Sequence, residues 1–177
     1  MKTQLLVTSV GEDRPGIVAR ITEVFVAHKA NLEESRMAIL GGEFAAIMLV
    51  TLAQDKVTEL ETALKKLSVD GLTITTKSTK PSSAAGAQAV CKIQLTGADH
   101  EGIVHQVAKC LRDSGVNIHS METEVVPAPE TGVPLFSMHA RVQVPQSVSV
   151  DKLRAHLDQI ARNEAVDIKV ISHAGVA

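Results

Sequence analysis

The stretch GEDRPGIVARITEVFVAHKANL, residues 11–32, decides the fold because GADHEGIVHQVAKCLRDSGVNI, residues 97–118, repeats it at a constant offset. Six residues recur in the two stretches: Gly11, Asp13, Gly16, Ile17, Val18 and Asn31 return as Gly97, Asp99, Gly102, Ile103, Val104 and Asn117. After a short insertion at residues 126–132, the similarity resumes at Phe44 and Phe136. The sequence therefore consists of two copies of one structural unit.

Each copy predicts the order strand, helix, strand, strand, helix, strand. In the first copy, β-prone segments and helical apolar stripes predict strands at 4–10, 31–39, 43–52 and 72–77, and helices at 17–30 and 57–67. The dipeptide Gly41-Gly42 between the second and third strands is a hairpin signal. The second copy predicts strands near 90–95, 116–125, 134–144 and 166–171, and helices near 102–114 and 148–161.

This order predicts an α+β protein of two tandem ferredoxin-like βαββαβ domains, each with two helices on one face of an antiparallel sheet. We expect domain 1 at residues 1–78, a linker rich in Ser, Ala, Pro and Gly at 79–88, and domain 2 at 89–177. Residues 45–50 are apolar at every position, which predicts burial on both faces, whereas residues 135–144 alternate. We therefore expect the first sheet to have a partner on its helix-free face, either the other unit or another subunit.

The composition weighs against direct binding of nucleic acid. Aromatic residues make up 2% of the 177 residues, and 18 basic residues balance 20 acidic ones. Cys91 and Cys110 match no metal or redox spacing, which predicts two reduced thiols in a cytoplasmic protein. The apolar run near the N-terminus is too short for a signal peptide, and no run approaches the ~20 residues of a membrane span.

The loops that precede the first helix of each copy are candidate ligand sites. Free N–H groups at a helix N-terminus, beside a glycine that lets a ligand approach, attract a carboxylate or phosphate. The amides of Asn31 and Asn117, which begin the next strand, offer a donor and an acceptor. In this sheet order they reach such a loop only if two sheets join side by side.

Structural roles compete with ligand binding for the same residues. Asp13 and Asp99 would cap the helices. The glycines Gly16 and Gly102 would permit close packing of helix on strand, and the two asparagines would sit in left-handed turns.

The pattern Asp-Arg-Pro-Gly-Ile at residues 13–17, an Asn opening the second strand, and tandem βαββαβ units resemble ACT domains, the small regulatory modules that sense amino acids. A chain of two such units and a linker resembles the glycine cleavage system transcriptional repressor family. That resemblance implies a small amino-acid ligand such as glycine or serine, bound at interfaces between ACT units. It also implies control of transcription through a partner protein, possibly a DNA-binding regulator, rather than through direct DNA contact. A homodimer is compatible with this organisation.

The resemblance also implies the residues of two sites. The first site comprises Asp13, Arg14, Gly16, Ile17, Asn31 and Leu32, and the second comprises Asp99, His100, Gly102, Ile103, Asn117 and Ile118. The second loop has His100-Glu101 where the first has Arg14-Pro15, so binding there is expected to be altered or lost. The titration of His100 near neutral pH would make binding pH-dependent.

Other chemistries find less support in the sequence. The second copy contains His100, His105, His119 and His139, but no two have HxxxH spacing, so no metal and no cofactor is expected. The chain lacks GxSxG, P-loop and dinucleotide motifs, which favours a non-enzymatic protein. The alternatives are a ferredoxin-like acyl-phosphate hydrolase, with an Arg and an Asn holding phosphate and water, and a constitutive scaffold without a ligand.

Overall fold

The structure is a computed structural model that describes residues 1–80, 88–128 and 132–172. The chain divides into two compact units, Met1–Ser83 and Ala84–Ala177, called here the first and second unit. Of the predicted linker at 79–88, residues 81–87 lie outside the described residues. Its two end positions belong to strands, because β4 (Thr73–Thr79) ends at Thr79 and β5 (Gln88–Ala98) begins at Gln88.

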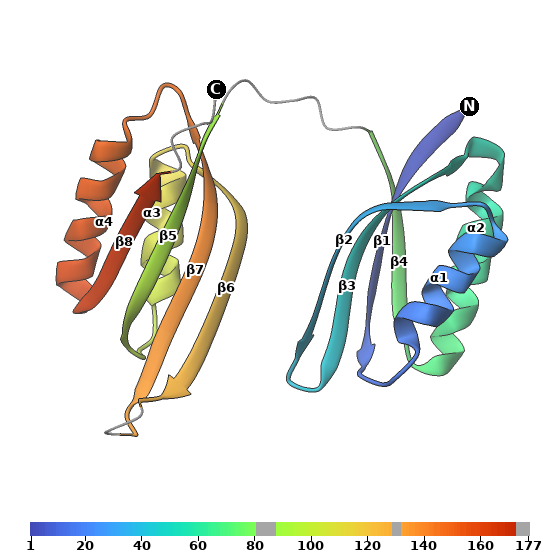
Figure 1. The fold of residues 1–177 in the computed structure, drawn as a ribbon, viewed down its shortest axis with the longest axis horizontal. Helices are drawn as coiled ribbons and strands as arrows, with labels where there is room; N and C mark the ends of the chain where they lie inside the picture. Colours follow the sequence, from blue (N-terminus) through green and yellow to red (C-terminus); the bar gives the residue numbers. More distant parts are fainter. Residues whose placement is uncertain (81–87, 129–131, 173–177) are drawn as a thin grey trace. The chain divides into compact units, whose positions relative to one another are not determined.

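The first unit has the predicted order of elements. They are β1 (Lys2–Glu12), α1 (Ile17–Ala27), β2 (Asn31–Leu40), β3 (Glu43–Ala53), α2 (Val57–Lys66) and β4, with short 3₁₀ turns at Gln54–Lys56 and Leu67–Asp70. The antiparallel sheet has the order β2-β3-β1-β4, and both helices cover one of its faces (Figure 1).

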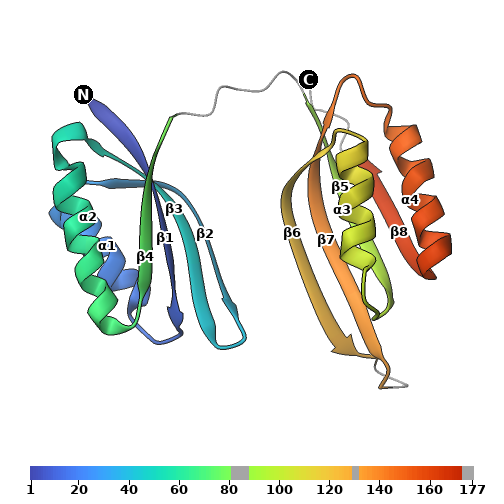
Figure 2. The same cartoon turned by 180° about the vertical axis from the view of Figure 1, so that it is seen from behind.

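The second unit repeats this arrangement. After β5 come α3 (Ile103–Asp113), β6 (Asn117–Pro127), β7 (Pro134–Pro145), α4 (Val150–Glu164) and β8 (Val166–Ser172). Its antiparallel sheet has the order β6-β7-β5-β8, again with both helices on one face (Figure 2). The predicted α+β, tandem ferredoxin-like fold is confirmed.

Several strands are longer than predicted. The strand expected at residues 4–10 runs from Lys2 to Glu12, because its backbone pairing with β3 continues beyond the apolar run. At the ends of this pairing Lys2 lies opposite Ala53, and Glu12 lies opposite Glu43. Strand limits are thus set by the partner's hydrogen bonds as well as by the strand's own hydrophobicity.

Each unit has its own core between helices and sheet. In the first unit the largest fully buried side chains include Leu5, Ile21, Phe25, Met48, Leu60 and Leu64, and in the second Ile93, Leu95, Ile103, Leu111, Met138 and Leu153. Both cysteines are free thiols, with Cys91 buried and Cys110 half-buried, and this burial raises the pKa of each. A raised pKa keeps a thiol protonated and less reactive at neutral pH.

The apolar run of β3 is buried on one face within its own unit. Phe44, Ala46, Met48, Val50 and Leu52 point toward the helices and are buried. Ile47 points to the helix-free face and is 44% exposed. The expected partner for this face stays a prediction, whereas the alternation predicted for residues 135–144 is confirmed in β7.

The two sheets distribute their methionines differently over two neighbouring strands. In the first unit Met37 of β2 lies opposite Ala46 of β3, while at the matching position of the second unit Thr123 lies opposite Met138. One row further along, the pair of Ser35 with Met48 is replaced by that of Met121 with Ala140. Each pair combines one methionine with one small residue, so the volume in each row is conserved although the strand that supplies it changes.

Candidate functional site

The strand-to-helix loop of the first unit ends in a helix N-terminus without a side-chain cap. Gly16 precedes α1 with φ at 94°, and no side chain accepts a hydrogen bond from the first turn. The first backbone bond of the helix is donated by the N–H of Arg20 to the carbonyl of Gly16. The N–H groups of the first turn therefore remain as donors for a ligand.

The second unit has the same local geometry. Gly102 precedes α3 with φ at 97°, and this helix also lacks a side-chain cap. The capping role considered for Asp13 and Asp99 is therefore wrong, because the residue directly before each helix is glycine and no aspartate reaches the first turn.

The glycines are required by backbone conformation rather than by packing. A Cβ placed on Gly16 or Gly102 would meet no heavy atom within 4 Å, so the close-packing role is wrong. Their φ values fall in the left-handed region, which side chains disfavour. The same geometry leaves open space above the helix N-terminus, through which a ligand can reach the backbone.

Each loop is fastened to the hairpin of its own sheet. The N–H of Asp13 donates to the carbonyl of Gly42 over 2.9 Å, and the N–H of Asp99 donates to the carbonyl of Pro134 over 3.1 Å. A hollow of about 340 Å³ opens at the first loop and is lined by Asp13, Arg14, Gly16 and Ile17, with Ile39 and Phe44. Four of the six residues predicted for the first site thus lie together.

The other two residues of that site lie at the far end of β2. Asn31 opens β2 opposite Thr51, whereas the hairpin end, with Leu40 opposite Glu43, lies nine residues along the strand. At ~3.4 Å per residue this is about 30 Å, so one unit does not bring Asn31 and Leu32 to its own loop. Asn117 and Ile118 hold the matching place in β6.

Neither asparagine lies in a left-handed turn. The residues with positive φ after the two helices are Lys29 and Gly115, and both asparagines begin strands, so the turn role is wrong. Asn31 Nδ2 donates to Glu33 Oε1 over 2.8 Å, and Asn117 Nδ2 donates to Gln143 Oε1 over 3.3 Å.

Two features near these strand starts are not apparent from the sequence. The register shifts between Leu32 and Glu34 and again between Ile118 and Ser120, which places a bulge beside both asparagines. Bulges commonly redirect side chains next to binding sites. They are visible only in the pairing pattern, because no glycine or other signal residue marks them.

Exposed apolar side chains lie on the edge strand and on the first helix of each unit. In the first unit Val18 is 40%, Met37 39% and Ile39 59% exposed, and in the second Val104 is 37% and Val125 51% exposed. In the sequence, this surface could have been predicted from Met37 and Ile39, two apolar residues at alternate positions of β2, the edge strand of the sheet. An apolar edge strand is a surface for pairing with another chain.

His100 fastens the second loop to α4. Its Nδ1 lies 3.1 Å from the carbonyl of Glu101, and its Nε2 lies 3.1 Å from the carbonyl of Glu164. These two carbonyls, followed by the charges of Glu164 and Asp99, raise the pKa of His100 above its ordinary value of 6.5. A neutral imidazole donates from one ring nitrogen only, whereas the imidazolium donates to both carbonyls.

The His100 contacts predict a pH-dependent stability of the second unit. A group whose pKa is raised on folding stabilises the fold fully below its unfolded pKa, and this contribution is lost as pH rises through the folded pKa. We therefore expect wild-type protein to lose stability relative to His100→Gln as pH rises from about 6 to 8. Urea unfolding across this range measures the difference, and equal pH dependence of the two proteins would contradict it.

Within residues 1–80, 88–128 and 132–172, no group of three or more His, Cys, Asp or Glu side chains is placed to hold a metal ion. In the same part of the chain, no helix is long and apolar enough to cross a membrane.

Comparison with known proteins shows which proteins this chain resembles. A family model described as ACT domain matches residues 3–77. A UPF0237 protein of Methanopyrus kandleri is 42% identical over 74 residues, which cover 38% of this chain and 82% of that protein. The glycine cleavage system transcriptional repressor of Escherichia coli is 32% identical over 126 residues, which cover 70% of this chain and 66% of the repressor. The crystal structure of an unknown protein from Galdieria sulphuraria superimposes with a TM-score of 0.88 at 33% identity, covering 98% of this chain and all of that one.

Proposed function

We propose that this protein, which belongs to the ACT-domain family, is a regulator that senses a small amino acid and has no catalytic activity of its own. It is a tandem ACT-domain protein related to the glycine cleavage system transcriptional repressor. The proposed ligand is glycine or serine, and its occupancy is passed on to a protein partner such as a DNA-binding regulator. The near-balance of 18 basic and 20 acidic residues and the lack of Trp and Tyr favour a protein partner over direct contact with DNA.

The observation that carries this proposal is the uncapped helix N-terminus behind a left-handed glycine. The first-turn N–H groups of α1 and the positive end of the helix dipole suit the carboxylate of an amino acid. Asp13, which lines the same hollow, offers a carboxylate for the ligand's ammonium group. A zwitterion therefore finds both charges matched within one loop, and the open space above Gly16 admits it.

We propose that a second copy of the chain completes the site. If the edge strands β2 of two copies pair antiparallel, the Asn31 end of one strand meets the hairpin end of the other. The hairpin end carries the loop, because Asp13 is bonded to Gly42. The exposed Met37 and Ile39 give this edge the apolar surface that pairing would cover. The amide of Asn31 then completes the site from across the interface.

We expect the second loop to bind the same ligand more weakly. The second loop keeps Asp99 and the left-handed Gly102. It has His100 where the first loop has Arg14, and the ring of His100 is already engaged with the carbonyls of Glu101 and Glu164.

Calorimetric titration with glycine, serine and the other common amino acids tests the proposal. Saturable binding of one of them, together with a dimer in light scattering, is the expected result. Silence from all of them would refute the sensing function and leave a constitutive scaffold. Hydrolysis of an acyl phosphate above background would refute the absence of catalysis.

Replacing Asn31 by alanine should weaken amino-acid binding by about 1–3 kcal/mol, because the ligand loses a hydrogen bond and keeps an unmatched polar group. This corresponds to a roughly five- to 150-fold rise in Kd in the same titration. Asn117→Ala is the matched control. It should change the Kd of the first site, the tighter of the two, less than Asn31→Ala does. An unchanged Kd in Asn31→Ala would locate the ligand elsewhere.

A further inference from the structure

The helix-free faces of the two sheets carry different chemistry at matching positions. In the first unit Leu6 of β1 lies directly opposite Leu49 of β3. The corresponding pair in the second unit is Lys92 of β5 and Arg141 of β7. One row further along, Thr8 opposite Ile47 is replaced by Gln94 opposite His139. The two copies share a fold, so folding does not require the charged residues that the second unit carries on this face.

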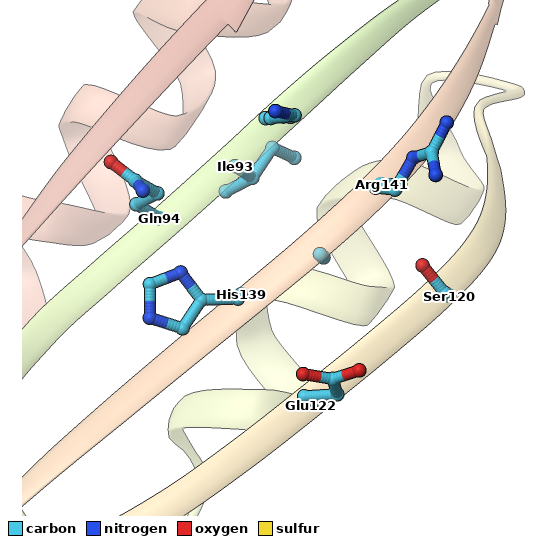
Figure 3. A pocket seen from close by; sticks show the side chains of 8 residues that line it. Ile93, Gln94, Ser120, Glu122, His139 and Arg141 are labelled. Carbon is cyan, nitrogen blue, oxygen red and sulfur yellow. The ribbon is translucent and has the colours of Figure 1, made fainter. Parts of the chain in front are cut away.

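A hollow of about 260 Å³ lies on the changed face of the second unit. Figure 3 shows the side chains of Gln94, Ser120, Glu122, His139 and Arg141, which come from β5, β6 and β7 and stand on this face. The register places Ser120 beside Arg141 and Glu122 beside His139. The hollow thus has a cationic end at Lys92 and Arg141, and a single acidic side chain, Glu122, in its lining.

The two cations face each other without compensation from the protein. Like charges directly opposite on antiparallel strands destabilise a sheet. Among the residues that the structure describes, neither Lys92 nor Arg141 forms an ion pair or a side-chain hydrogen bond. The leucine pair of the first unit demonstrates that the fold does not need charges here. An anion between the two side chains would turn this repulsion into attraction.

We propose that this hollow is a second binding site, distinct from the loop sites, for a small molecule that carries a phosphate or carboxylate group. The guanidinium of Arg141 and the ammonium of Lys92 bind the oxyanion. Arginine presents paired N–H groups that match two oxygens of either anion. Ser120, next to Arg141, and Gln94, next to His139, supply neutral hydrogen bonds within the same hollow.

The dimensions and charges of the hollow limit the ligand. Its volume of about 260 Å³ suits a metabolite-sized molecule rather than a peptide or nucleic acid. Glu122 would repel a second anionic group at its end of the hollow. The ligand therefore combines one oxyanion with a hydroxyl or ammonium group that Glu122 can accept a hydrogen bond from.

Calorimetry with inorganic phosphate and with glycolate, which carries one carboxylate and one hydroxyl, tests the site and distinguishes the two anions, each measured against sodium chloride of equal ionic strength. We expect the wild-type protein to bind at least one of them, and Lys92→Leu/Arg141→Leu, which installs the residues of the first unit, to bind at least tenfold more weakly. The variant Lys92→Gln/Arg141→Gln should behave in the same way if the leucines cause aggregation. Lys109→Gln removes a cation from α3, on the other side of the sheet, and should bind like the wild type.

Phosphate could also occupy the uncapped N-termini of α1 and α3, and the variants separate these possibilities. Equal affinity in the wild type and both double variants, or no binding of either anion by the wild type, would overturn the proposal. The amino-acid ligand of the loop sites is not contacted by Lys92 or Arg141, so failure of the loop site in the amino-acid titration and failure of this site in the anion titration are distinguishable.

Discussion

Phe25→Ala is expected to lower the free energy of unfolding of the first unit by about 3–5 kcal/mol. Phe25 lies in the last turns of α1, is 2% exposed and belongs to the buried cluster between helices and sheet. Alanine removes the whole ring, and the surrounding side chains come from rigid strands and a second helix, so the cavity cannot close. Urea unfolding followed by circular dichroism measures the loss.

The next residue in the helix gives a matched control. Val26 is 76% exposed, so Val26→Ala should change the free energy of unfolding by no more than about 0.5 kcal/mol. Amide hydrogen exchange should show the loss of protection in Phe25→Ala within the first unit, because the second unit has its own core. A similar small effect of both substitutions would mean that α1 does not pack as the structure describes.

Gly97→Ala is expected to destabilise the second unit by about 1–3 kcal/mol through overpacking. A Cβ at this position would lie 2.5 Å from Cγ1 of Val166 and 2.9 Å from its Cβ. Val166 begins β8 and is 7% exposed, so it has little room to move. Val166→Ala removes the shortest of these contacts, at Cγ1, and keeps the Cβ at 2.9 Å, so it should restore only part of the lost stability, which a double-mutant cycle detects as a favourable coupling.

The first unit provides the contrasting case. At the matching Gly11, a Cβ would lie 2.6 Å from the backbone carbonyl of Gly71 and 2.9 Å from Cδ2 of Leu72. Truncating Leu72 removes only the second of these contacts, so Leu72→Ala should not rescue Gly11→Ala. A coupling of zero between Gly97 and Val166, or full rescue at Gly11, would contradict this explanation of the two glycines.

The fold could be predicted because two independent signals agree in both copies. Helical apolar stripes and alternating segments predict the order of elements. The same order recurs in the second copy at one offset, so the pattern is not a coincidence of one segment. Element limits were less accurate: α4 ends at Glu164 rather than near Ala161, since polar residues on its solvent side extend the helix beyond the apolar stripe.

The candidate site could be predicted only in part. The sequence located the loops and the strand starts, but not the backbone angles, and these decided against a cap at Asp13 and a left-handed turn at Asn31. The bulges beside the asparagines depend on how two strands pair, which no single strand encodes. The cation pair of Lys92 and Arg141 was equally hidden, because the two residues meet only through the register of β5 and β7.

The different positions of the methionines in the two sheets affect whether a strand of one copy can pair with a strand of the other during folding. A hairpin error that paired β2 with β7 would set Met37 against Met138 and, one row on, Ser35 against Ala140. The first row would then hold two methionines and the next row none, so the side-chain volumes of both rows would differ from those in either native sheet. Adjacent copies of one fold are prone to such strand swapping. The different placement of the methionines in the two copies therefore disfavours pairing of β2 with β7.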